Sequence, residues 1–95
     1  MTDKSVIIYK LKNIIQEIDK NNNKNVLDRL YPMQIHEIEL ENILPYKLFK
    51  DFCMNYDIIC FLLYNETYTN YNNIVAHDYR YSALKILNYL KYEKI

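Results

Sequence analysis

The 95-residue sequence contains no glycine, whereas average usage predicts about seven in a chain of this length. Without glycine, the sequence has no phosphate-binding GxxxxGKS/T loop, no GxGxxG dinucleotide turn and no GxSxG nucleophile elbow. Each of these motifs needs a residue without a Cβ atom at a tight turn or a close backbone approach. The missing glycines therefore exclude the common nucleotide-binding loops and the hydrolase elbow.

Several other features are absent or scarce. The sequence has no tryptophan, two prolines, two cysteines and two alanines. No apolar run reaches the roughly 18 residues of a membrane-spanning helix. The first residues, 1–13, lack the apolar stretch and the small-residue cleavage site of a signal peptide. We therefore expect a cytoplasmic protein without a membrane span.

Four residue types dominate the composition. Isoleucine, asparagine, tyrosine and lysine supply 46 of the 95 residues, and their codons are rich in A and T. This indicates an AT-rich genome, such as those of low-GC bacteria, their phages and several large DNA viruses. The hydrophobic content of 51% excludes intrinsic disorder, and the length predicts a single domain over 1–95.

Apolar spacing predicts an all-α fold, a small bundle of three to five helices. Over residues 3–20, apolar residues recur at i, i+4, i+7 and i+11, with Thr2 or Asp3 as the expected N-cap. A short helix is expected before Pro32, and a second clear helix begins at Pro45. The last helix is expected to run from Asn73 or Asp78 to Tyr92.

Two segments fit either a helix or a strand. In residues 34–40, apolar residues alternate with glutamates, as on a half-buried strand. The apolar run 58–64 continues the preceding helix or forms a short central strand, and periodicity alone does not separate these alternatives. The unbroken helical register through 58–64 favours a helix, so an α+β fold with strands near 34–40 and 58–64 is the alternative.

The sequence offers little for catalysis or metal binding. Cys53 and Cys60 are expected to be buried thiols that act as small hydrophobic residues. Their spacing to each other, and to His36 and His77, does not match the paired ligands of structural zinc sites. We therefore predict no metal, no cofactor and no enzymatic activity, and we interpret Asp78 as the cap of the last helix.

Tyrosine is the most informative feature, because seven of its eleven copies fall between residues 64 and 92. The core of one helix uses about two of them, and tyrosine is enriched at protein interfaces. Codon bias with ordinary packing is an equally weighted explanation. The predicted partner-binding residues are Tyr64, Tyr68, Tyr71, Tyr79, Arg80, Tyr81, Tyr89 and Tyr92.

These observations favour a small non-enzymatic protein-binding module. Its size and composition are typical of an inhibitor or adaptor from a phage, a virus or a mobile element that acts on a host protein, such as an anti-CRISPR or an immunity-type inhibitor. The alternative is a single-stranded nucleic-acid-binding or transcription-regulatory protein that uses tyrosine, lysine and arginine of the last helix. The zero formal charge weighs against it. Homodimerisation is a further alternative.

Overall fold

The computed structural model describes residues 4–20, 29–30, 35, 37–65 and 71–92. The described residues form four helices: α1 (Lys4–Lys20), α3 (Glu37–Glu41), α4 (Tyr46–Tyr64) and α5 (Tyr71–Tyr92). No strand occurs in this part of the chain. The predicted all-α fold is confirmed.

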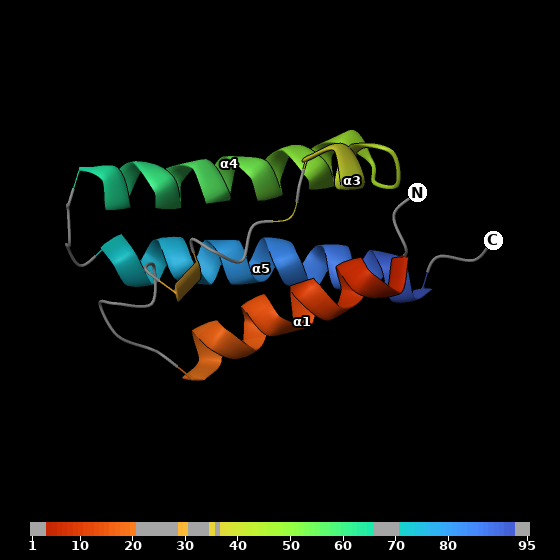
Figure 1. Ribbon diagram of the computed structural model, residues 1–95, viewed down its shortest axis with the longest axis horizontal. Helices are drawn as coiled ribbons and strands as arrows, with labels where there is room; N and C mark the ends of the chain where they lie inside the picture. The colour runs from red at the N-terminus through yellow and green to blue at the C-terminus, as the bar shows by residue number, and fades with distance from the viewer. Residues whose placement is uncertain (1–3, 21–28, 31–34, 36, 66–70, 93–95) are drawn as a thin grey trace.

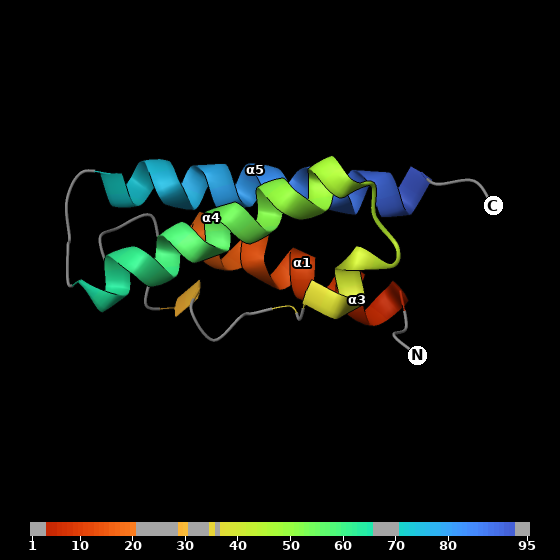
Figure 2. The same ribbon diagram turned by 90° about the horizontal axis from the view of Figure 1, so that it is seen from above.

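Helix α5 is the element on which the other long helices pack. It contacts both α1 and α4 along its length. Both neighbours run antiparallel to it, as Figure 1 shows. The short helix α3 packs on α4 and lies on the side of α1 and α4 that faces away from α5 (Figure 2). The molecule is elongated, with extents of 43 × 22 × 20 Å, and none of its described helices is long and apolar enough to cross a membrane.

The apolar stripe of α1 faces the core as its spacing predicts. Four residues at i, i+4, i+7 and i+11 are at most 4% exposed: Ile7, Leu11, Ile14 and Ile18. Such a stripe lies on one side of a helix with 3.6 residues per turn. The expected N-cap residues, Thr2 and Asp3, lie outside the described residues, as does most of the short helix expected before Pro32.

The buried face of α5 combines small and large apolar residues. Ala76 and Ala83, the two alanines of the sequence, are both buried there. Ile86, Leu87 and Leu90 extend the same face towards the end of the helix. Because the distance between packed helices depends on the side chains at the contact, the alanines let α1 and α4 approach α5 closely.

Helix α4 continues without a break through the segment whose conformation was ambiguous. Phe52 and Ile59 are buried at 2% and 1% exposure, and Tyr56 and Leu63 pack against the same core. This is the helical register expected for 58–64, so the strand alternative is wrong there. In the other ambiguous segment, the residues from Glu37 onward are helical, and residues 34 and 36 lie outside the described residues.

Two predicted helix starts are corrected. Helix α5 begins at Tyr71 and not at Asn73 or Asp78, so Asp78 lies inside the helix and does not cap it. Residues 71–73 are helical because the packing of the later residues of α5 stabilises the helix as a whole. Pro45 is the N-cap of α4, with φ −56° and ψ 144°, and the helix itself begins at Tyr46.

Among the described residues, three ion pairs connect segments that are far apart in the sequence. Arg80 Nε of α5 lies 2.9 Å from Asp19 Oδ1 of α1. Lys10 Nζ of α1 lies 3.7 Å from Glu39 Oε2 of α3, and Arg29 Nη1 lies 3.5 Å from Glu17 Oε1. Each pair has at least one partner that is more than a third exposed, and ion pairs in contact with solvent contribute little free energy. The apolar contacts with α5 therefore supply most of the stability.

This assignment of the core predicts different effects for two isoleucines of α5. Ile86 is 0% exposed and Ile74 is 55% exposed. Ile86→Ala should lower the free energy of unfolding by about 2–5 kcal/mol, because it leaves a cavity in the core. Ile74→Ala should change it by less than about 0.5 kcal/mol. Urea unfolding followed by circular dichroism measures both values, and equal losses would contradict the assignment.

Candidate functional site

Those of the predicted tyrosines whose side chains the structure describes do not form one surface. Tyr64 is 89% exposed at the end of α4, and Tyr81 is 61% exposed on α5. Tyr64 lies level with the first residue of α5. Tyr81 follows that first residue by ten positions, which corresponds to about 15 Å along the helix axis. Tyr89 is half-buried and packs against the core. Tyr68 lies outside the described residues, as do the side chains of Tyr71 and Tyr92, although both residues belong to α5.

Arg80 has a structural role in this arrangement. Its guanidinium donates hydrogen bonds to both carboxylate oxygens of Asp19, at 2.9 Å from Nε and 3.5 Å from Nη2. The side chain therefore lies at the contact between α1 and α5. This ion pair engages the guanidinium within the protein, which weakens the predicted role of Arg80 in partner binding.

Tyr79 belongs to the core and not to the surface, which corrects its predicted role. Its side chain is 0% exposed, and its ring stacks on Phe52 of α4 with 4.8 Å between centroids. The Tyr56 ring lies 6.2 Å away. The Tyr79 hydroxyl is buried and has no hydrogen-bond partner among the residues that the structure describes. Burial raises the pKa of Tyr79 well above its usual 10.0, with smaller contributions from Tyr56 and the two cysteines.

Several large apolar side chains are exposed on α4 and α5, and most of them are not among the predicted partner-binding residues. On α4, Met54, Ile58 and Phe61 recur at i, i+4 and i+7 and are 51%, 42% and 65% exposed. On α5, Ile74 and Tyr81 recur at i and i+7 and are 55% and 61% exposed. Met54 of α4 and Tyr81 of α5 line one groove between these helices, and the other three side chains share their helix faces at these spacings. The five side chains therefore lie on one side of the helix pair. We call this surface the outer face.

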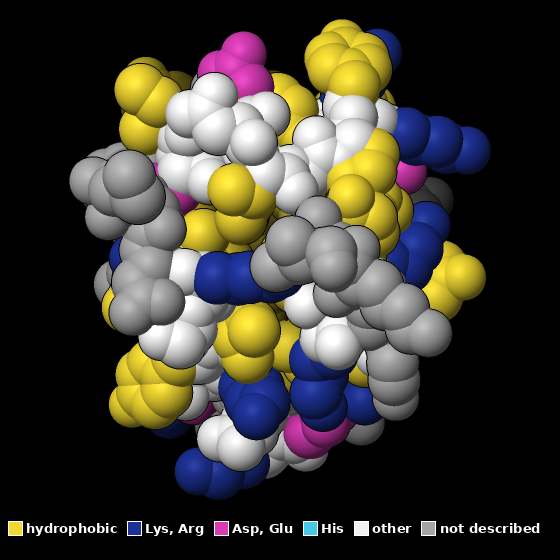
Figure 3. All heavy atoms as spheres, turned by 90° about the vertical axis from the view of Figure 1, so that its right-hand side faces the viewer, with side chains coloured by type: hydrophobic (Ala, Val, Ile, Leu, Met, Phe, Trp, Pro, Cys, Tyr) yellow, Lys and Arg dark blue, Asp and Glu magenta, His cyan; other side chains and the backbone are white. Residues whose placement is uncertain are grey.

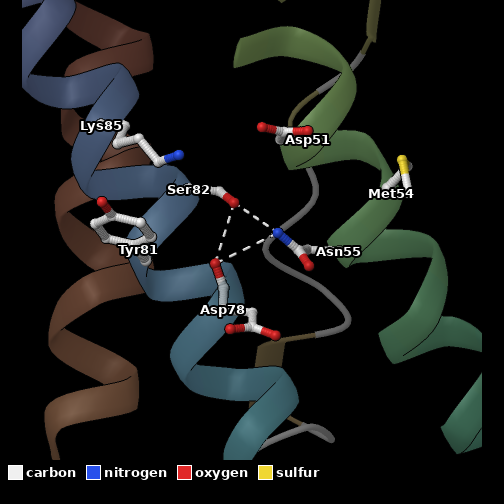
Figure 4. A pocket seen from close by; sticks show the side chains of 7 residues that line it. All are labelled: Asp51, Met54, Asn55, Asp78, Tyr81, Ser82 and Lys85. Atoms are coloured by element: carbon white, nitrogen blue, oxygen red, sulfur yellow. Dashed lines mark hydrogen bonds between the residues drawn. The ribbon is translucent and has the colours of Figure 1, made fainter. Parts of the chain in front are cut away.

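A groove lies between α4 and α5 in the middle of the outer face (Figure 4). Its volume is about 180 Å³. Three residues of α4 and four residues of α5 line it: Asp51, Met54, Asn55, Asp78, Tyr81, Ser82 and Lys85. Apolar rims and a polar floor thus meet where the two helices pack.

Hydrogen bonds between the two helices form the floor of the groove. Asn55 Nδ2 donates to Ser82 Oγ at 2.6 Å and to the Asp78 carbonyl oxygen at 3.4 Å. The Ser82 hydroxyl donates to the Asp78 carbonyl oxygen at 3.0 Å. Ser82 is 5% exposed, and these bonds satisfy its hydroxyl as both acceptor and donor. The floor is therefore a structural contact that fixes α4 against α5.

Positive charge borders the outer face at the end where α4 begins and α5 ends. Figure 3 looks onto this end, and hydrophobic side chains reach the surface there between Lys and Arg side chains. Lys47, Lys50 and Lys91 are exposed. Lys50 Nζ lies 5.8 Å from the centre of the Tyr46 ring. The outer face therefore has a basic border beside its apolar residues.

The cysteines and histidines do not assemble into a metal site within the described residues. Within the described residues Cys53 and Cys60 form no disulfide, and both are half-buried, which corrects the expectation that both are buried. Both thiols remain partly accessible because α5 covers only part of the side of α4 that carries them. His77 is exposed, and His36 lies outside the described residues. No group of three or more metal-ligating side chains occurs in the part of the chain that the structure describes.

No protein-family model matches this chain, and no curated protein or solved structure matches it. The residues of α4 nevertheless contain the signal that identifies the outer face. Phe52, Tyr56 and Ile59 mark one apolar side of the helix, and Met54, Ile58 and Phe61 mark a second. A small bundle buries one side of a peripheral helix. An excess of apolar residues on such a helix therefore indicates a surface that stays exposed.

The buried hydroxyl of Tyr79 leads to a prediction about stability and its pH dependence. Tyr79→Phe removes a buried hydroxyl without a partner, so it should raise the free energy of unfolding by about 1 kcal/mol at pH 7. Above pH 10, the unfolded chain ionises Tyr79 while the folded chain, with its raised pKa, does not. Wild-type stability should therefore fall as pH rises, and the advantage of the variant should grow by about 1 kcal/mol between pH 9 and 11.

Urea unfolding of both proteins at pH 7, 9 and 11 measures these differences. The two proteins differ only at position 79, so the difference between them isolates the contribution of Tyr79. A variant that is less stable at pH 7, or an advantage that stays constant with pH, would contradict the buried, unpartnered position of the hydroxyl.

Proposed function

We propose that this chain is a small non-enzymatic protein-binding module and that the outer face is its binding surface. In biological terms it is an inhibitor or adaptor of a phage, a virus or a mobile element, directed at a host protein. The observation that carries the proposal is the exposure of Met54, Ile58, Phe61, Ile74 and Tyr81 on one side of two packed helices. Contiguous exposed apolar residues are typical of protein-binding surfaces.

The partner that fits this surface is a protein with an apolar ridge, such as one side of an amphipathic helix. Two antiparallel helices leave a shallow groove between them, and an apolar helix face packs into such a groove through side chains spaced i, i+3 and i+4. The Asn55–Ser82 hydrogen bond holds the two sides of the groove together. A surface that is already rigid loses less conformational entropy when it binds.

The energetics favour a few apolar anchors. Full burial of a Phe, Ile or Met side chain contributes about 1.5–3 kcal/mol, against an association cost of at least about 4 kcal/mol. Three to five such side chains are therefore enough for measurable binding. Phe61 is the strongest candidate for an anchor, because it is a large aromatic residue that is 65% exposed in the free chain.

The polar groups near the outer face also support a binding role over a catalytic one. The Ser82 hydroxyl already makes two hydrogen bonds. In nucleophilic catalysis a serine instead pairs with an adjacent general base. The alternative, single-stranded nucleic-acid binding through α5, draws on Arg80, Tyr81 and Lys85. It is weakened because Arg80 pairs with Asp19.

Two apolar substitutions test the proposal. Photo-cross-linking in the cells where the chain acts identifies its partner. The double variant Ile58→Ala with Phe61→Ala should then bind the purified partner at least about tenfold more weakly, because hot-spot truncations cost more than about 1 kcal/mol each. The matched control is Ile38→Ala, which removes a 70% exposed isoleucine from α3, and it should bind within about twofold of wild type.

Thermal unfolding of all three proteins confirms that the substitutions leave the fold intact. Equal binding by the double variant and wild type would place the interface elsewhere and contradict the proposal. Retention of the chain on single-stranded nucleic acid, with the salt dependence of phosphate contacts and without a protein partner, would overturn it in favour of the alternative.

A further inference from the structure

The outer face is basic at the end where α4 begins. Lys47 and Lys50 precede Met54 by seven and four residues, so these three side chains lie on one side of α4. Both lysines are exposed. Lys85 of α5 lies at the same end of the groove as Asp51, as Figure 4 shows. The apolar residues of the outer face are therefore followed by three lysines, Lys47, Lys50 and Lys85, which we call the basic end.

The protein does not neutralise the basic end. None of its three lysines forms an ion pair with another described residue. Asp51, which lines the groove there, is half-buried, so three ammonium groups against one carboxylate leave an excess of positive charge. Lys50 Nζ lies 5.8 Å from the centre of the Tyr46 ring, and Lys85 Nζ lies 4.5 Å from that of Tyr81. These rings position two of the ammonium groups while leaving N–H donors for a bound molecule.

The opposite end of the outer face carries negative charge. Asp57 precedes Phe61 by four residues on α4, and Asp78 follows Ile74 by four residues on α5. Residues at this spacing are neighbours on a helix surface, and both aspartates are exposed. A carboxylate on a bound protein is therefore attracted to the basic end and repelled at the opposite end. The charges give the outer face a direction.

The spacing of the lysines and the apolar residues on α4 sets a length. Lys47 precedes Ile58 by eleven residues, and Lys50 precedes Phe61 by the same number. Eleven residues correspond to about 16 Å along the axis and to about three turns, so a helix returns to the same side at this distance. A partner helix that lies along the outer face therefore meets both groups with residues about eleven positions apart.

We infer that the outer face binds an amphipathic helix whose apolar side ends in aspartate or glutamate residues. This inference rests on the proposed function, and it specifies the charge and the orientation of the partner. The partner's apolar residues cover Ile58 and Phe61, and its carboxylates, about eleven positions away, pair with Lys47 and Lys50. Ion pairs in contact with solvent are weak. They therefore select the orientation, while the apolar residues supply most of the affinity.

The test uses helical peptides of known sequence, so it does not depend on knowing the partner. The glutamate peptide is an alanine-based helix of about 20 residues. Its leucines are spaced i, i+3, i+4 and i+7, and three glutamates follow the first three leucines by eleven positions. The glutamine peptide and the lysine peptide differ from it only at those three positions. Each is titrated into the full chain at about 0.15 M salt, and amide chemical shifts are followed by NMR.

The glutamate peptide should give saturable shifts at Lys50 and Phe61. It should bind about fivefold more tightly than the glutamine peptide, as expected for two surface ion pairs. The difference should disappear at about 1 M salt, where charges more than about 3 Å apart are screened. Equal affinity for these two peptides at the lower salt concentration, or no saturable binding of either, would overturn the inference.

Reversal of charge on the chain identifies the lysines. Lys47→Glu combined with Lys50→Glu should weaken binding of the glutamate peptide by about tenfold, and it should strengthen binding of the lysine peptide. The matched control is Lys12→Glu combined with Lys20→Glu, which reverses two exposed lysines of α1. The control changes the net charge equally and should alter the affinity by less than about twofold. Thermal unfolding confirms that both variants are folded.

Equal weakening by the control would show that net charge alone decides the affinity, and it would overturn the inference. A single-stranded oligothymidylate that binds the basic end more tightly than the glutamate peptide would overturn it in favour of a nucleic-acid partner.

The two proposals fail in different ways. If Ile58→Ala combined with Phe61→Ala weakens binding of the glutamate and glutamine peptides alike, and their affinities are equal, the preference for acidic residues is overturned and the apolar surface stands. If Lys47 and Lys50 decide the affinity but the alanine variant binds as wild type does, the apolar surface is overturned and only the preference for acidic residues stands.

Discussion

The burial of α5 by two helices at once is the constraint on which the rest of this structure depends. Tyr79 stacks on Phe52 of α4, while Arg80 on the next position reaches Asp19 of α1. Because α1 and α4 occupy two sides of α5, its third side remains at the surface. That third side carries Ile74 and Tyr81, and it continues onto α4 to form the outer face. The exposed surface is thus a direct consequence of how the core is built.

The outer face combines a rigid support with adaptable side chains. Its floor is held by the Asn55–Ser82 hydrogen bond across two long helices, and its rims consist of Met54, Tyr81 and their apolar neighbours. Methionine adapts to irregular surfaces, and tyrosine brings a large contact area with few rotatable bonds. In a chain without glycine, close backbone approach to a ligand is rare, so recognition through side chains on helices is the consistent interpretation.

The sequence predicts the all-α fold correctly, but it does not predict which apolar side chains stay exposed, and the reason is physical. The i, i+4 spacing of Ile7 and Leu11 predicts a buried stripe, because one helix has one core side. Spacing places Tyr79 on the core side of α5 with Ala76 and Ala83, but the clustering of tyrosines predicts it as a partner-binding residue, and the structure shows it in the core. Spacing does not predict that Met54 and Phe61 are exposed, because their exposure depends on the position of α1 relative to α4 and α5.

A binding surface on the outer face requires that this face be open in the free chain, and hydroxyl-radical footprinting measures that exposure. Phe61 and Phe52 are the same residue type on the same helix, at 65% and 2% exposure. Phe61 should be oxidised several times faster than Phe52 in the free chain at every protein concentration, and its oxidation rate should fall when the partner is added. Equal, slow oxidation of both residues in the dilute free chain would show that the protein itself covers this face and would contradict the account.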